Sequence, residues 1–277
     1  MKYKIIVDSM SNLTNQDVLS EDVPVSVVPL SLRINGKDYV DDGSEKVEDI
    51  MKLISAEKKI ESSTGCPSPK AFLDEMTGAD RYIVITISQK VSGSYNSACL
   101  AKSMLENPDS CFVLDSMSDC GVIELLARKA IDLIHGGKDF DEICREVEAY
   151  RSEVNILFII NKFDSLIRTG RVSKLVASIA SILKIKPLGI AKGGEIRIQE
   201  KVRTIEGTVK RLIVNIEKFC ANTQDRICVI SHTLNLTSAL NVKKLIEEKY
   251  HFKEIIIREN RLVNSYYALE GCVMVSF

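Results

Sequence analysis

The stretch RYIVITISQKVSGSYNSACLA, residues 81–101, decides the fold class of this chain. An apolar, β-branched run ends in a cluster of serines and a glycine, and an alanine-rich segment follows. The pattern predicts a buried strand that passes through a short loop into a helix. Such a βα unit is typical of a parallel sheet, because parallel neighbours need crossover connections.

The same rhythm recurs through the first half of the chain. KIIVDS and CFVLDS read as further strands, and we expect helices near residues 45–58, from Ser92, and near 119–135. We therefore predict an N-terminal α/β/α domain with a mainly parallel sheet. An early insertion carries Asn35-Gly36 between two β-rich runs, which predicts a type I′ hairpin. Its flanking prolines place this hairpin at the sheet edge.

A second domain is expected after a boundary near residue 155, giving domains 1–155 and 156–277. NILFIIN begins it as a strand, and a helical stretch, RVSKLVASIASILKI, follows. A hairpin turning at Gly193-Gly194 precedes alternating helices and strands, with helices near residues 205–221 and 236–249. Mixed hairpin and crossover signals predict a C-terminal α/β domain with a mixed or antiparallel sheet.

Composition excludes several classes of function. The net charge of -1 over 277 residues gives no basic face for nucleic acid. No run approaches the roughly 18 apolar residues of a membrane span, so we expect a cytoplasmic protein with at most transient membrane contact. The eight cysteines and three histidines lack the spacing of a metal site, and we expect mostly buried thiols, no metal and no cofactor.

Candidate binding residues follow three strands that end alike, in KIIVDSMS, ITISQKVSGSY and FVLDSMSD. Ligands of open α/β sheets bind beyond the carboxyl ends of the strands. Ser92 is predicted to cap the next helix, whose N-terminus, with Ser94, attracts a carboxylate or phosphate. Gly93 lets a ligand approach the backbone. No nucleophile elbow or P-loop is present, so no catalytic residue is expected.

A second helix start is expected at Ser68-Pro69, with Thr64-Gly65 in the loop before it. Two such loops could grip one anion. The alternative is that serine and glycine at these junctions serve only ordinary capping and turn chemistry. Asp8 and Asp115, at strand ends, are as suited to capping neighbouring loops as to touching a ligand.

Several motifs in order resemble those of the DegV family, two-domain bacterial proteins that hold a long-chain fatty acid. DSMSNL is similar to the family's DSTSDL, STGCPSP to TSQPSP, VSGSYNSA to LSGTYQSA, SLIRTGRVS to LxxGGRIS, and ILKIKPL to LLxIKPI. The resemblance implies that the carboxylate of a fatty acid such as palmitate binds Thr64 and Ser92. It also implies an acyl tunnel between the domains, lined by residues between Val172 and Leu188.

Many family members present the acid to a fatty acid kinase, and these usually carry a C-terminal GTHTGPGALG segment. Here the C-terminus reads NSYYALEGCVMVSF, with Tyr266 nearest the histidine position and no GPG. Arg171 and Arg203 match two arginines that surround the head group in the family. We expect a non-catalytic lipid carrier; the alternatives are a kinase-presenting subunit and a small-anion binder that has lost lipid binding.

Overall fold

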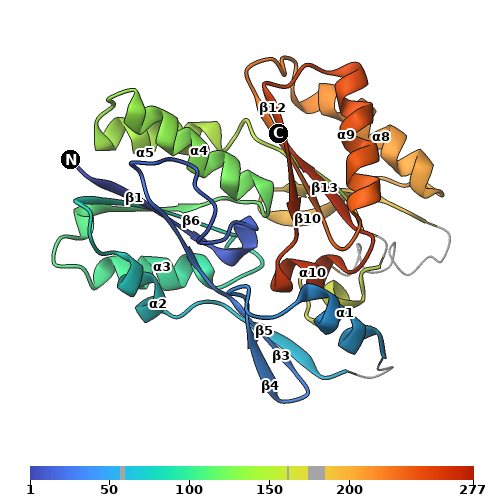
Figure 1. Ribbon diagram of the computed structural model, residues 1–277, viewed down its shortest axis with the longest axis horizontal. Coiled ribbons are helices and arrows are strands. Elements are labelled where there is room, and N and C mark those ends of the chain that lie inside the picture. The colour runs from blue at the N-terminus through green and yellow to red at the C-terminus, as the bar shows by residue number, and fades with distance from the viewer. Residues whose placement is uncertain (57–59, 161, 174–184) are drawn as a thin grey trace.

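The computed structural model describes residues 1–56, 60–160, 162–173 and 185–277. The four-stranded and six-stranded sheets lie side by side at opposite ends of the molecule, and α1 (Val47–Ala56) from the N-terminal half lies beside α10 (Leu262–Ala268) from the C-terminal half (Figure 1). No helix in these ranges is long and apolar enough to cross a bilayer. The predicted helical stretch at RVSKLVASIASILKI lies mostly outside the described residues. The division at residue 155 stays a prediction.

The first sheet is wholly parallel, with strand order β2-β1-β6-β7. Its strands are β1 (Tyr3–Asp8), β2 (Val25–Val28), β6 (Arg81–Thr86) and β7 (Cys111–Asp115). Helices α2 (Pro69–Glu75) and α3 (Ser94–Ser103) cover one face, and α4 (Gly121–His135) and α5 (Phe140–Tyr150) cover the other. Alternate residues of β1 point to the two faces: Ile6 packs with α2 and α3, and Val7 with α4. The predicted mainly parallel α/β/α domain is confirmed.

The predicted hairpin forms, but not at the edge of this sheet. Strands β3 (Ser31–Ile34) and β4 (Lys37–Val40) meet at Asn35 and Gly36, whose φ angles are 48° and 83°. Strand β5 (Ser62–Gly65) joins them in a separate three-stranded sheet, and helix α1 (Val47–Ala56) lies in the connection. The physical reason is that β2 itself occupies the edge position beside β1.

The second sheet is mixed, with strand order β10-β9-β8-β13-β11-β12. Only β11 and β12 run parallel; the other pairs are antiparallel, as the predicted mixed sheet requires. The strands are β8 (Ile156–Ile159), β9 (Leu188–Lys192), β10 (Glu195–Glu200), β11 (Ile227–His232), β12 (Glu254–Glu259) and β13 (Val273–Ser276). The helices are α6 (Asp164–Arg168), α8 (Ile205–Phe219), α9 (Leu236–Lys249) and α10 (Leu262–Ala268).

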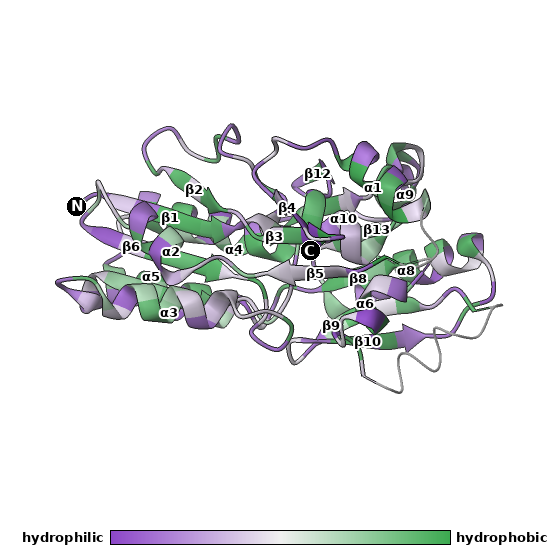
Figure 2. Ribbon diagram, turned by 90° about the horizontal axis from the view of Figure 1, so that it is seen from below, coloured by the Kyte–Doolittle hydropathy of each residue, from purple (hydrophilic) through white to green (hydrophobic). Residues whose placement is uncertain are grey.

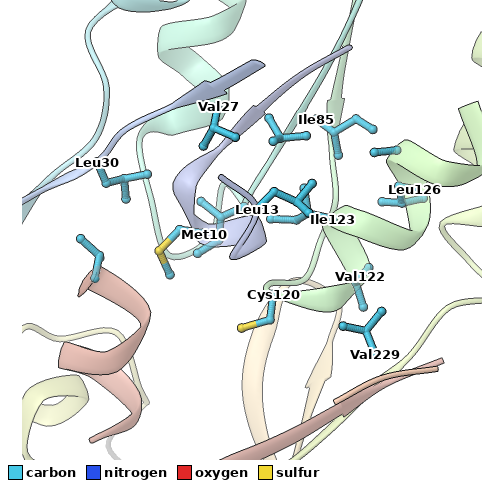
Figure 3. Close-up of a cluster of buried hydrophobic side chains, with 14 of the residues drawn as sticks. Met10, Leu13, Val27, Leu30, Ile85, Cys120, Val122, Ile123, Leu126 and Val229 are labelled. Atoms are coloured by element: carbon cyan, nitrogen blue, oxygen red, sulfur yellow. The ribbon is translucent and has the colours of Figure 1, made fainter. Parts of the chain in front are cut away.

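The mixed sheet is buried on both faces, as strand β8 illustrates. All four of its residues are apolar and buried. Leu157 packs with α8 and α9, whereas Phe158 belongs to a core cluster that continues into the first half. Within that cluster Val122 of α4 faces Val229 of β11 (Figure 3). The hydropathy of the elements agrees with their positions in the core or on the surface. Strands β1 and β8 are largely hydrophobic, whereas helices α3 and α5 are mixed (Figure 2).

Candidate ligand cavity

The carboxyl ends of β1, β6 and β7 form one rim, as predicted from their similar sequences. The backbone NH of Ile87 donates to Asp8 Oδ2 at 2.9 Å, and Asp115 Oδ1 accepts from the NH of Gln89 at 3.2 Å and of Met117 at 2.9 Å. Asp8 and Asp115 therefore hold the rim loops together. Of the two uses that the sequence leaves open for these aspartates, the structure shows loop capping.

A cavity lies at this rim between the two halves of the chain. Met10 and Leu30 line it from the first half, and Phe158, Ile196 and Met274 line it from the second. Most of its lining is aliphatic or aromatic. Met10 and Leu30 belong to the buried cluster that connects the two halves (Figure 3). The cavity is thus an apolar space between the sheets that reaches a polar rim.

Thr64 and Ser92 both line this cavity, although they come from different elements. Thr64 is on strand β5, opposite Leu32 of β3, and not in a loop as predicted. Its Oγ1 lies 2.6 Å from the hydroxyl oxygen of Tyr267. Ser92 Oγ accepts from the NH of Ser94 at 3.2 Å. The two sites that the sequence singles out meet at one cavity.

The cap of α3 differs from the prediction by one residue. The helix begins at Ser94, and Gly93 occupies the N-cap position with no side-chain hydrogen bond. Ser92 precedes the cap and makes a short turn with Ser94, whose Oγ lies 3.0 Å away. Ser94 is fully buried and is not among the described residues that line the cavity. Ser94 therefore supports Ser92 rather than facing a ligand.

Gly93 lines the cavity, and its lack of a side chain matters for a contact within the protein. A Cβ built on Gly93 would lie 2.9 Å from Cys66 Sγ. A side chain at residue 93 would therefore require the Cys66 thiol to move. In the same segment, Ser68 caps α2 and Pro69 opens it, as predicted.

The two predicted arginines lie in different environments. Arg171 lines the cavity, and its Nη1 donates to the carbonyl of Thr169 at 2.7 Å. Arg203 is exposed just before α8 and is not among the described residues that line the cavity. The structure brings Arg171, but not Arg203, to the same cavity as Thr64 and Ser92.

Tyr267, which the sequence analysis does not single out, faces the cavity in place of its neighbour Tyr266. Tyr266 is fully buried, and its hydroxyl oxygen lies 2.9 Å from Ser62 Oγ. Helical spacing could have revealed this: Asn264, Tyr267 and Ala268 of α10 all line the cavity, at positions i, i+3 and i+4. Burial raises the pKa of Tyr267, so its hydroxyl stays protonated and can donate to Thr64.

The chemistry available at the rim is anion binding. Three residues with hydroxyl groups, Thr64, Ser92 and Tyr267, line the cavity together with Arg171, and no histidine is among the described residues that line it. Within the described part of the chain, no three histidine, cysteine, aspartate or glutamate side chains are grouped to hold a metal ion. Five of the eight cysteines are buried, and all eight are free thiols.

Comparisons with known proteins place these features in a wider context. A family model described as uncharacterised protein, DegV family, matches residues 2–277. A DegV domain-containing protein of Streptococcus pyogenes serotype M3 is 32% identical, covering 100% of this chain and 99% of the relative. The chain is also similar to the Streptococcus pneumoniae Fatty Acid Kinase (Fak) B3 protein loaded with linoleic acid, with 30% identity, a TM-score of 0.92, and coverage of 100% and 99%. A DegV family protein of Ruminococcus gnavus, refined with vaccenic acid, has 28% identity, a TM-score of 0.90, and 99% coverage of each chain.

Proposed function

The chain belongs to the DegV family, and on that premise we propose that it binds a long-chain fatty acid in the cavity between its halves. The carboxylate is held between Thr64 and Ser92, and the acyl chain extends along the apolar lining. One observation carries the proposal: two hydroxyls from separate elements meet at a cavity that is otherwise mostly apolar. Structural neighbours from S. pneumoniae and R. gnavus that hold fatty acids support it.

The energetics favour such a ligand. Burial gains about 0.8 kcal/mol per CH₂, so a chain of about sixteen carbons gains roughly 10 kcal/mol before the costs of ordering it. The carboxylate opposes burial unless hydrogen bonds replace its water. When Tyr267 donates to Thr64 Oγ1, the hydroxyl hydrogen of Thr64 is free for a carboxylate oxygen. Ser92 can donate a second hydrogen bond, and Arg171 supplies positive charge at the cavity wall.

The proposed role is that of a carrier without catalytic chemistry of its own. Ser92 Oγ has the hydroxyl and the NH of Ser94 as its partners, an arrangement that contains no imidazole to act as general base. The polar groups at the rim are suited to binding a carboxylate and leaving it unchanged. A small-anion binder without lipid would make no use of the apolar lining.

Native mass spectrometry of the protein purified from a bacterial host, with solvent extraction of what it carries, tests the proposal. We expect about one fatty acid per chain, and less retained by the variant Ser92→Ala. Ser103→Ala, an exposed serine at the other end of α3, is the control and should carry as much lipid as the unmodified protein. The proposal would be overturned if the purified protein carries no fatty acid and takes up neither palmitate nor oleate.

A second role, presenting the bound acid to a fatty acid kinase, is favoured by the S. pneumoniae neighbour, a Fatty Acid Kinase (Fak) B3 protein. In that role the γ-phosphoryl group of ATP would pass to the carboxylate, forming an acyl phosphate and ADP. Arg171 would steady the added charge. The exposed position of Arg203 and the tyrosines that stand in place of the family's histidine weigh against it.

An assay with a kinase subunit, ATP and bound palmitate separates this second role from simple carriage. Acyl phosphate formation, detected as the hydroxamate, would support presentation to a kinase. No acyl phosphate from this protein, under conditions in which the S. pneumoniae protein succeeds, would exclude the role for that kinase.

A further inference from the structure

Two further polar side chains, Asp119 and Asn264, line the cavity on elements that carry neither Thr64 nor Ser92. Asp119 precedes Cys120, the N-cap residue of α4, and Asn264 is on α10. The carbonyl oxygen of Met10 joins them: it accepts from the NH of Cys120 at 3.1 Å and from Asn264 Nδ2 at 2.8 Å. The same NH of Cys120 also donates to Asp119 Oδ1 at 2.7 Å. The two side chains are therefore neighbours across one backbone carbonyl.

Asn264 presents an acceptor without a partner. The residue is 1% exposed, and its Nδ2 donates to the carbonyl of Met10 and to Asn12 Oδ1, at 2.8 and 2.7 Å. Both amide hydrogens are thus used, and the two acceptors fix the orientation of the amide. Its Oδ1 accepts no hydrogen bond from any residue that the structure describes. Because Asn264 lines the cavity, this amide oxygen is available to a hydrogen-bond donor from a ligand or water there.

Asp119 presents a second polar atom of the same kind. Its Oδ1 is occupied by the NH of Cys120, whereas Oδ2 has no hydrogen-bond partner within the described ranges. Asp119 is half-buried and is one of the residues that line the cavity. Burial raises the pKa of Asp119 to about 7, so near neutrality the carboxyl is partly protonated and able to donate as well as accept.

We propose that Asp119 and Asn264 form a subsite for a hydroxyl group on the acyl chain, so that the cavity prefers a hydroxylated long-chain fatty acid to the unsubstituted acid. This inference rests on the proposed function. A hydroxyl can donate to Asn264 Oδ1 and accept from the protonated carboxyl of Asp119, which satisfies both groups together. A methylene at the same place would leave both unpaired. Sites built to hydrogen bond a substrate hydroxyl reject the analogue that lacks it for this reason.

The test compares dissociation constants for stearic acid and for positional isomers of hydroxystearic acid that cover the chain from the carboxyl to the methyl end. We expect one isomer to bind roughly tenfold or more tightly than stearic acid, because one to two buried hydrogen bonds are gained. The hydroxyl position of the isomer that binds most tightly then locates the subsite along the acyl chain. The unmodified protein alone suffices for this comparison.

Two matched variants assign the preference to Asp119. In Asp119→Leu, the preference for the hydroxylated isomer should disappear while stearic acid binds as well or better. In Asp132→Leu, an exposed aspartate of α4, the preference should persist. A preference that survives Asp119→Leu, or stearic acid binding at least as tightly as every isomer, would overturn the inference. If neither stearic acid nor any isomer binds, the proposed function fails, and the subsite with it.

Discussion

At the scale of single residues, the hydroxyls of Thr64 and Ser92 carry the proposed recognition of the carboxylate. Removing either one, in Thr64→Val or Ser92→Ala, should weaken palmitate binding by about 10- to 100-fold, because a hydrogen bond to a charged group contributes about 1.5–3 kcal/mol. Titration calorimetry on delipidated protein gives the constants. Ser103→Ala should bind as the unmodified protein does, and equal affinity in all four proteins would refute this head-group assignment.

The neighbouring tyrosines of α10 allow a matched comparison. Tyr267→Phe removes the hydroxyl that lies 2.6 Å from Thr64 Oγ1, so the Thr64 hydroxyl is no longer oriented and palmitate affinity should fall several-fold. Tyr266→Phe removes the contact with Ser62 instead, which should lower the free energy of unfolding by about 1 kcal/mol and leave affinity unchanged. Denaturant titrations give the unfolding free energy of each variant, and binding isotherms give its affinity for palmitate. Weaker palmitate binding in Tyr266→Phe than in Tyr267→Phe would contradict the assignment of Tyr267 to the cavity.

Asp119 predicts how stability changes with pH. Its pKa rises from 3.8 to about 7 on folding, so the folded protein holds a proton that the unfolded chain has lost. The favourable contribution is therefore present below about pH 4 and is lost as pH rises to about 7. Asp119→Asn cannot ionise, so its stability relative to the unmodified protein should be greater at about pH 8 than at about pH 4. Urea unfolding at both values checks this; a difference that does not change with pH would count against a raised pKa of Asp119 in the folded protein.

Sequence reasoning located some of these residues and missed others for identifiable reasons. Thr64 and Ser92 follow local patterns, and the resemblance to a family selects the same pair. Tyr266 was selected by its nearness to a family position, but adjacent residues of a helix point about 100° apart, and only Tyr267 faces the cavity. Arg203 was selected in the same way, and its distance from the cavity depends on tertiary packing.

At the scale of elements, the close contact between β9 and β8 leaves room for a side chain that lines the cavity. Gly189 of β9 lies opposite Phe158 of β8, and a Cβ on Gly189 would lie 1.9 Å from the Phe158 ring. Gly189→Ala should displace that ring, which lines the cavity, and lower the free energy of unfolding by about 1–3 kcal/mol. We also expect weaker palmitate binding, measured by calorimetry.

Two further variants make that prediction specific. Gly136→Ala, where the nearest atom to a new Cβ is at 3.4 Å, should change stability and binding little. The double variant Gly189→Ala/Phe158→Leu should recover part of the lost stability because the smaller side chain leaves room for the methyl group. If Gly189→Ala is as stable as Gly136→Ala, the contact between residue 189 and the Phe158 ring is not tight.

Most elements could be predicted from the sequence because their signals are local. The Asn35-Gly36 and Gly193-Gly194 turns and the Ser68-Pro69 helix start each specify their own backbone conformation. The place of the first hairpin could not be predicted, because it depends on β5, which is separated from it by helix α1. Short polar SSTG has no strand pattern of its own and forms β5 by pairing with β3.

At the scale of the whole molecule, charged groups join the two halves beside the shared core. Arg258 of β12 donates to both carboxylate oxygens of Glu124 on α4, at 3.0 and 2.9 Å, and also contacts Asp17. Glu124 is fully buried and also accepts hydrogen bonds from Arg128, so removing Arg258 leaves this buried carboxylate with one of its two cationic partners. Arg258→Met should cost about 3 kcal/mol of unfolding free energy, measured in urea. Arg197→Met, in an exposed pair with Glu195, should cost less than about 1 kcal/mol. Similar losses of unfolding free energy in the two variants would show that the buried pair contributes no more stability than the exposed pair.

The most direct test of the central claim is a crystal structure of the protein grown with palmitic acid. We predict electron density for one acyl chain along the apolar cavity between the sheets, with a carboxylate oxygen about 2.5–3.0 Å from both Thr64 Oγ1 and Ser92 Oγ. A cavity that stays without lipid, or a chain bound in reverse with its carboxylate away from both hydroxyls, would contradict the account.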